Sequence, residues 1–107
     1  MTNDPGRTAL MPASARPSTA PLYHVVLLDD DDHTYEYVVE MLCKLFQHSQ
    51  EFAFKLACEV DGAGRAIVET TVLERAELKR DQIHAYGADR RLKRSRGSMS
   101  AKLERAN

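Results

Sequence analysis

An abrupt change from apolar to acidic residues restricts the fold of this chain more than any other feature. Four contiguous apolar residues, Val25 to Leu28, are followed directly by four aspartates, Asp29 to Asp32, and a helical pattern begins at once. Adjacent carboxylates repel one another, so we expect such a cluster only where its negative charge has a structural or binding role. The aspartates serve either as helix caps or as an anionic mouth at a strand end, suited to a cation such as a protonated amine.

The length and charge of the chain exclude several broad classes of protein. With 107 residues there is room for one small domain and a tail, and the net charge of −1 favours neither nucleic acid nor membrane. No apolar run approaches the roughly 20 residues of a membrane span, and the N-terminus lacks the apolar segment of a secretory signal. We therefore expect a cytoplasmic protein without membrane contact.

All four prolines lie within the first 21 residues, among Thr, Ser, Ala and Gly. Such a segment has too few bulky apolar residues to offset the entropy lost on ordering. We therefore predict a flexible arm over residues 1–21 and a single folded domain over residues 22–107. The arm either has no specific role or is a segment that another protein complex binds.

The apolar run over residues 23–28 is typical of a strand that is covered on at least one face. Residues 34–47 are predicted to be helical. Apolar side chains recur there at helical spacing: Val38, Met41, Leu42, Leu45 and Phe46. Asp31, Asp32 or His33 precedes this helix as its cap, and the helix dipole favours acids at this end.

A second helix is predicted after Ser49, which is a suitable N-cap. Its apolar side chains fall on one side: Phe52, Ala53, Leu56, Ala57 and Val60. The helix is expected to stop at residues 61–64, where two glycines permit positive φ and a turn. Residues 65–70 then alternate between apolar and polar, which predicts a short strand.

The last predicted elements are a helix and a weaker strand. Thr71 and Glu74 match a capping box, and the helix that they open runs to about Tyr86, with Gly87 after it. Residues 98–105 are the strand candidate. The order is β-α-α-β-α-β, and the economical solution is an α/β (α+β) two-layer sandwich in which three helices pack on a three-stranded sheet.

The chain shows no pattern of catalytic or cofactor-binding residues. There is no strained nucleophilic serine, no phosphate loop and no dinucleotide motif. The aspartates lack the spacing of a calcium loop, and the four histidines lack ligand spacing. Cys43 and Cys58 fall inside helical patterns and are expected as buried, reduced thiols, with a disulfide as the alternative. We predict no metal, no cofactor and no enzymatic activity.

A basic run near the C-terminus is the other charged feature. It contains Arg90, Arg91, Lys93, Arg94 and Arg96. Five cations in seven residues could contact RNA or DNA through phosphate. However, no aromatic side chain lies within the run to stack on a base, and a solvated loop is the simpler interpretation.

These patterns together resemble the ClpS family. The series Tyr-His-Val-Val-Leu-Leu-Asp-Asp-Asp at residues 23–31, followed by Glu36-Tyr37-Val38, is similar to the family's aromatic-x-aliphatic strand, Asn-Asp-Asp turn and Glu-Phe/Tyr-Val helix start. Gly64-Arg65-Ala66 is similar to its Gly-Lys/Arg-Ala. The resemblance covers residues 22–88 without a gap and continues more loosely after a longer, more basic loop.

The resemblance implies a non-enzymatic adaptor that binds the first residue of a protein and hands the chain to the ClpAP or ClpCP protease. Asp29, Asp30 and Asp61 would receive the α-amino group. The pocket for the first side chain would have six lining residues: Leu27, Tyr35, Val38, Ala57, Val60 and Met99. Glu74 and Lys79 match positions that dock on the N-terminal domain of the unfoldase, and the proline-rich arm matches the extension presented to its pore.

Four positions depart from the family pattern. Asp29 replaces the turn's Asn and Asp61 replaces a histidine, so two groups that can donate become acceptors only. Ala57 stands where a larger residue, often Met, gates the pocket, and Tyr35 replaces an aliphatic residue at its mouth. We therefore expect a more anionic amine site and a differently shaped pocket.

The function expected from the sequence is thus a monomeric adaptor of substrate proteins with a hydrophobic or aromatic first residue, delivered to a ClpA- or ClpC-type unfoldase. One alternative is an interaction domain of the same fold with a different ligand. Another is an RNA- or ribosome-associated protein that acts through residues 90–96.

Overall fold

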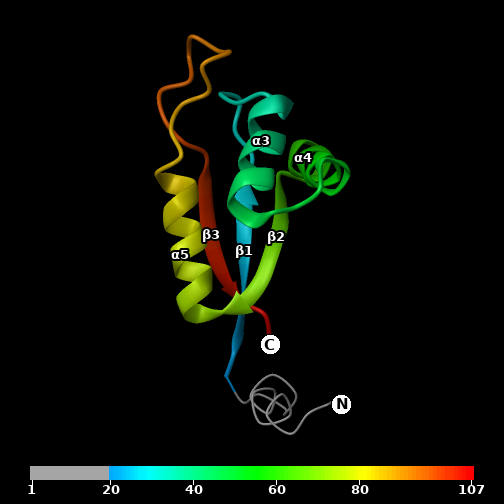
Figure 1. The fold of residues 1–107 in the computed structure, drawn as a ribbon, viewed down its shortest axis with the longest axis vertical. Coiled ribbons are helices and arrows are strands. Elements are labelled where there is room, and N and C mark those ends of the chain that lie inside the picture. The colour runs from blue at the N-terminus through cyan, green and yellow to red at the C-terminus, as the bar shows by residue number, and fades with distance from the viewer. Residues whose placement is uncertain (1–19) are drawn as a thin grey trace, which may run out of the picture.

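A computed structural model describes residues 20–107 and shows a three-stranded antiparallel sheet in the order β2-β1-β3 (Figure 1). The strands are β1 (Leu22–Leu28), β2 (Arg65–Val72) and β3 (Ser100–Arg105). The predicted arm lies almost entirely outside the described residues. The α+β class and the element order predicted from the sequence are confirmed.

β1 is the central strand, which explains why its side chains form a continuous apolar run. Leu27 pairs with Ala66 of β2 on one side and with Ala101 of β3 on the other. The register to β2 shifts between Val25 and Val26. A bulge of this kind increases the local twist of the strand. The carboxyl end of β1 leads directly into the four aspartates.

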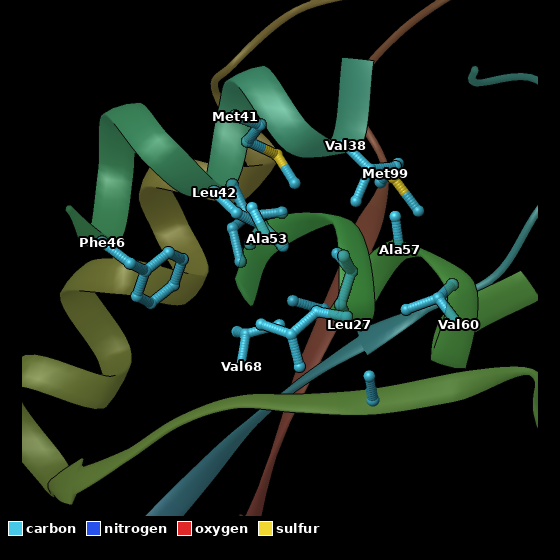
Figure 2. Close-up of a cluster of buried hydrophobic side chains, with 14 of the residues drawn as sticks. Leu27, Val38, Met41, Leu42, Phe46, Ala53, Ala57, Val60, Val68 and Met99 are labelled. Carbon is cyan, nitrogen blue, oxygen red and sulfur yellow. The ribbon is translucent and has the colours of Figure 1, made fainter. Parts of the chain in front are cut away.

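Within residues 20–107 the sheet is joined by three helices: α3 (Tyr35–Phe46), α4 (Gln50–Ala63) and α5 (Leu73–His84). Figure 1 shows α3 beside α4 over one end of the sheet, and α5 alongside β3. Residues 85–99 connect α5 to β3 and extend beyond the sheet near the beginning of α3. The apolar faces of the helices and the covered face of the sheet enclose one core (Figure 2).

Two predicted helix starts are wrong. Thr34, not Asp31, Asp32 or His33, caps α3, because its hydroxyl accepts from the N–H of Tyr37 at 3.1 Å. The capping box at Thr71 is absent: the cap of α5 is Val72, which makes no side-chain cap bond. Thr71 cannot cap because it is still paired with Tyr23 in the sheet.

Two further expectations require correction. Asp61 does not lie in a turn, because α4 continues to Ala63 and ends at Gly64, whose φ of 84° makes it the left-handed C-cap. Cys58 is exposed rather than buried, and Cys43 is half-buried; both thiols are free. No helix within residues 20–107 is long and apolar enough to cross a membrane.

Candidate functional site

A cavity of about 300 Å³ opens where β1 ends, between the first turn of α3 and the last turn of α4. We call it the acidic cavity. Its lining consists of Asp29, Asp30, Asp31, His33, Thr34, Tyr35, Val38, Ala57, Val60, Asp61, Arg94 and Met99. All the residues predicted to bind an amine or a side chain are therefore brought together, except Leu27. Leu27 is fully buried in the core (Figure 2).

The floor of the acidic cavity is apolar. Figure 2 shows Val38, Ala57 and Met99 converging from α3, α4 and the residue before β3, with Val60 one turn further along α4. Each of these four side chains is at most 6% exposed. Ala57 contributes only a methyl group, so the floor keeps space that a larger side chain at this position would fill. The floor can accept an apolar group of a ligand.

The rim of the cavity is anionic. The backbone N–H of Asp29 donates to the carbonyl of Gly64 at 3.0 Å, which fixes the strand end against the end of α4. Removal from solvent raises the pKa of the Asp29 carboxyl, the N–H of Asp30 opposes this, and the charges of Asp61, Asp31 and Asp30 raise it further. A cation placed here would relieve that repulsion.

Asp30 is held by a histidine that the sequence did not single out. Its Oδ1 accepts from the N–H of Asp32 at 2.9 Å and lies 2.7 Å from Nδ1 of His33. The other ring nitrogen of His33 lies 2.7 Å from the carbonyl of Gly97. Both ring nitrogens of His33 thus face oxygen atoms, which fixes the ring between Asp30 and the loop at Gly97.

Asp61 faces the mouth from the opposite side. The hydroxyl of Tyr35 donates to its Oδ2 at 2.6 Å, and this hydrogen bond raises the pKa of Tyr35 to about 12. The Tyr35 ring lies against Phe54, with 5.7 Å between the ring centroids. The mouth is therefore narrowed by an aromatic side chain whose hydroxyl already occupies one oxygen of Asp61.

The basic loop closes the remaining side of the cavity through Arg94. Its Nε donates to the backbone carbonyl of Asp31 at 2.8 Å and lies 3.4 Å from Oδ1 of Asp32. Arg94 thus anchors Asp31 and Asp32 to the loop, whereas the N-cap of α3 is Thr34. No charge pattern in the sequence indicated this pairing between segments 63 residues apart.

Asp89 anchors the same loop to α3. Its carboxylate accepts from the backbone N–H and the hydroxyl of Thr34, at 2.7 and 2.8 Å, and from the N–H of Arg91 at 2.9 Å. The side chain is 1% exposed. Burial raises its pKa, but the hydrogen bonds from Thr34 and Arg91 prevail and lower it to about 2. Asp89 therefore orients the capping residue of the helix that borders the cavity.

The two residues expected to dock on an unfoldase lie in different environments on α5. Glu74 is exposed in the first turn. Lys79 is only 8% exposed; its ammonium donates to the carbonyl of Leu45 and to Gln82, 3.1 Å away, and lies 5.4 Å from the centroid of the Phe46 ring. The Lys79 side chain would have to turn outward to reach a partner.

Within the described part of the chain, no group of three or more His, Cys, Asp or Glu side chains is arranged to hold a metal ion. The acidic cavity instead combines carboxylates with an apolar floor. Such a site can bind a small group that carries a positive charge next to an apolar side chain. The fold and the cavity thus define a small α+β domain built for non-covalent binding.

Comparison with known proteins assigns this domain to a family. The model of the family described as "ATP-dependent Clp protease adaptor protein ClpS" matches residues 18–93. The chain belongs to the ClpS family, whose members are adaptors and not catalysts. The family predicted from the sequence is therefore confirmed, as is the role of Clp protease adaptor.

Individual relatives agree with this assignment. The ClpS adapter protein of Nautilia profundicola is 36% identical over 63 residues, which are 59% of this chain and 65% of the relative. The ClpS adapter protein of Mycobacterium marinum is 31% identical over 83 residues, which are 78% and 82% of the two chains. The structure of Agrobacterium tumefaciens ClpS2 bound to L-phenylalaninamide has a TM-score of 0.68 at 24% identity, covering 79% of this chain and 96% of that one. This last likeness supports the fold.

Proposed function

We propose that the acidic cavity binds the free N-terminal residue of substrate proteins, which the adaptor delivers to a Clp unfoldase for degradation. One observation carries the proposal: Asp29 and Asp30 border the same cavity as Asp61, which lies far from them in the sequence on α4, and the floor of this cavity is apolar. A volume of about 300 Å³ suits a single side chain rather than a folded surface.

The α-amino group supplies a positive charge next to Asp29 and Asp61, which form no ion pair with any residue of the range 20–107. An ammonium near Asp29 and Asp61 makes charge-assisted hydrogen bonds, which are shorter and stronger than neutral ones. It also reduces the carboxylate repulsion that raises the pKa of Asp29. Binding alone is required, and no covalent bond is made or broken.

The first side chain enters the apolar floor. Val38, Val60 and Met99 are buried apolar groups, and the small Ala57 leaves depth for a large hydrophobic or aromatic residue such as Leu, Phe, Tyr or Trp. The ligand named for the Agrobacterium tumefaciens structure, L-phenylalaninamide, has the same two parts: a free amine and an aromatic side chain. This supports the same class of ligand here.

Delivery requires a second surface, and we assign it to the exposed side of α5. Glu74 lies there at the beginning of the helix and is open to a partner. The partner is the N-terminal domain of a ClpA- or ClpC-type unfoldase, bound by one adaptor molecule in the cytoplasm. Residues 1–21 would be the segment presented to the unfoldase pore.

A degradation assay tests the proposed function. A reporter that begins with Phe and one that begins with Met are incubated with the cognate Clp unfoldase and protease, with and without this chain. We expect the chain to accelerate loss of the Phe reporter alone. A chain lacking residues 1–20 should still bind the Phe reporter but fail to deliver it. Equal loss of both reporters would refute selection by the first residue.

A further inference from the structure

A second hollow, about 600 Å³ in volume, lies on a different face of α3 from the acidic cavity. We call it the basic hollow. Its lining consists of Tyr37, Glu40, Lys44, Tyr86, Ala88, Arg90 and Arg91. Three of these side chains are cationic and one is anionic, so its charge is opposite to that of the acidic cavity. The N-terminal amine site uses none of these residues.

Two of the three cations are not neutralised by the fold. Arg91 lies 3.3 Å from Asp89 and 3.6 Å from Glu40, so its charge is already shared. Arg90 and Lys44 form no ion pair with any residue of the range 20–107. The ammonium of Lys44 lies 6.0 Å from the centroid of the Tyr86 ring. The basic hollow therefore presents two cations whose field is available to a ligand.

The wall that carries Arg90 is held in place by partly buried hydrogen bonds. The hydroxyl of Tyr37 donates to the carbonyl of Gly87, and the N–H of Gly87 donates to Ser98 at 2.6 Å. Asp89, which is 1% exposed, ties the next turn to Thr34. A surface fixed in this way loses little conformational entropy when a ligand binds.

We propose that the basic hollow is a docking site for an acidic segment of polypeptide. Arg and Lys side chains recognise carboxylates through charge-assisted hydrogen bonds. The volume accommodates more than one side chain, and Glu40 on the same wall can accept hydrogen bonds from the peptide's backbone N–H groups.

The same wall disfavours a nucleic acid. Glu40 would repel a phosphate backbone, and Tyr86, whose ring is packed edge-on against Tyr37, is half-buried and presents no open platform for stacking. The net charge of −1 for the whole chain also gives a nucleic acid no long-range attraction.

The two sites have no lining residue in common. From α3, the acidic cavity takes Tyr35 and Val38, whereas the basic hollow takes Tyr37, Glu40 and Lys44. An acidic segment of a partner could therefore dock while an amine occupies the other site. The docking proposal does not depend on the proposed function of the acidic cavity.

A fluorescent, N-acetylated hexaglutamate peptide tests the docking site, because acetylation prevents it from occupying an amine site. The probe is titrated into the full chain at low salt and followed by fluorescence anisotropy. We expect saturable binding, and no binding of the matched hexaglutamine peptide. Lys44→Glu combined with Arg90→Glu should weaken binding at least about tenfold, since attraction becomes repulsion.

The control is Lys55→Glu, a charge reversal at an exposed position of α4 that lies outside both sites. It should retain wild-type affinity to within about twofold. The neutral pair Lys44→Gln and Arg90→Gln, with circular dichroism to confirm folding, should weaken binding by an intermediate factor. Absence of hexaglutamate binding, equal binding of hexaglutamine, or an equal loss in Lys55→Glu would overturn the proposal. So would tighter binding of an RNA oligonucleotide with the same charge.

Discussion

The acidic cavity and the basic hollow border the same helix, α3, but they are built on different physical principles. The acidic cavity sets carboxylates around a buried apolar floor, so a ligand gains both from burial and from ion pairing. The basic hollow offers mainly exposed cations, Lys44 and Arg90, and depends on charge alone. A net charge of −1 for the whole chain hides two local fields of opposite sign.

The two sites share one structural support. Asp89 lines neither site, but it joins the loop of the basic hollow to Thr34, the N-cap of α3. The acidic cavity is bordered by the same N-terminal turn of α3. Substitutions and changes of condition can therefore be ranked by whether they affect both sites, one site or only the relative affinities of the two sites for their ligands.

The largest expected effect is that of Asp89→Ala, which removes the support common to both sites. Four donors, two from Thr34 and two from Arg91, lose a buried acceptor, and we expect the free energy of unfolding to fall by about 2 kcal/mol at pH 7. Guanidinium denaturation measures the change. Arg96→Ala, at an exposed position of the same loop, is the matched control and should be neutral.

The pH dependence of stability provides a second readout for Asp89. Its folded pKa of about 2 lies below the ordinary value of 3.8, so its stabilisation is fully present above pH 3.8 and is lost as the pH falls through 2. The free energy of unfolding of the wild type should therefore exceed that of Asp89→Ala above pH 3.8, and the difference should shrink as the pH falls to 2. A constant difference between the two proteins from pH 5 to pH 2 would contradict the assigned role.

Asp61→Ala should affect the acidic cavity alone. Loss of one charge-assisted hydrogen bond is expected to weaken binding of a Phe-initiated peptide about tenfold, with hexaglutamate binding unchanged. Asp32→Ala is the control, because Asp32 pairs with Arg94 and is not among the residues that line the cavity. Isothermal titration of the two variants measures the difference, and equal effects would remove Asp61 from the amine site.

Salt should weaken ligand binding at the two sites to different extents, without any substitution. Raising NaCl from 0.1 M to 1 M shortens the Debye length from about 10 Å to about 3 Å. Hexaglutamate affinity should fall about tenfold, whereas the Phe-initiated peptide, held partly by apolar burial, should lose only about threefold. Parallel anisotropy titrations test this, and an equal salt slope for both ligands would contradict the distinction between the sites.

The smallest expected effect is the pH dependence of amine binding. Because the pKa of Asp29 is raised, its carboxylate becomes protonated at a higher pH than an ordinary aspartate, and affinity for the amine is lost as the pH falls through that value. Asp29→Asn should bind about threefold more weakly at pH 7 and show a flatter profile towards pH 4. A profile identical to that of wild type would exclude Asp29 from the amine site.

Local sequence patterns predicted the elements and most of the cavity. Apolar spacing in residues 34–47 located α3, Ser49 was correctly identified as the cap of α4, and the family resemblance brought Asp61 to the same cavity as Asp29. Leu27, which was also predicted to line the pocket, is fully buried and is not among the residues that line the cavity. Burial of that kind depends on the neighbouring helices and not on the strand's own sequence.

Most of the contacts that could not be predicted involve residues 85–99. Asp89, Arg94 and Gly97 have no periodic pattern, and their partners Thr34, Asp31 and His33 lie more than 50 positions away. A loop residue becomes a buried acceptor only when tertiary structure supplies its donors. The burial of Lys79 could not be predicted either, because its position beside Phe46 depends on where α5 meets α3.

The central claim, that the acidic cavity holds a free α-amino group beside an apolar side chain, is tested most directly with one pair of peptides. Isothermal titration compares a Phe-initiated peptide with its N-acetylated twin in the wild-type chain. Acetylation removes the charge but keeps the side chain, and we expect the affinity to fall about 100-fold. Equal affinity for the two peptides, or binding of neither, would contradict the claim.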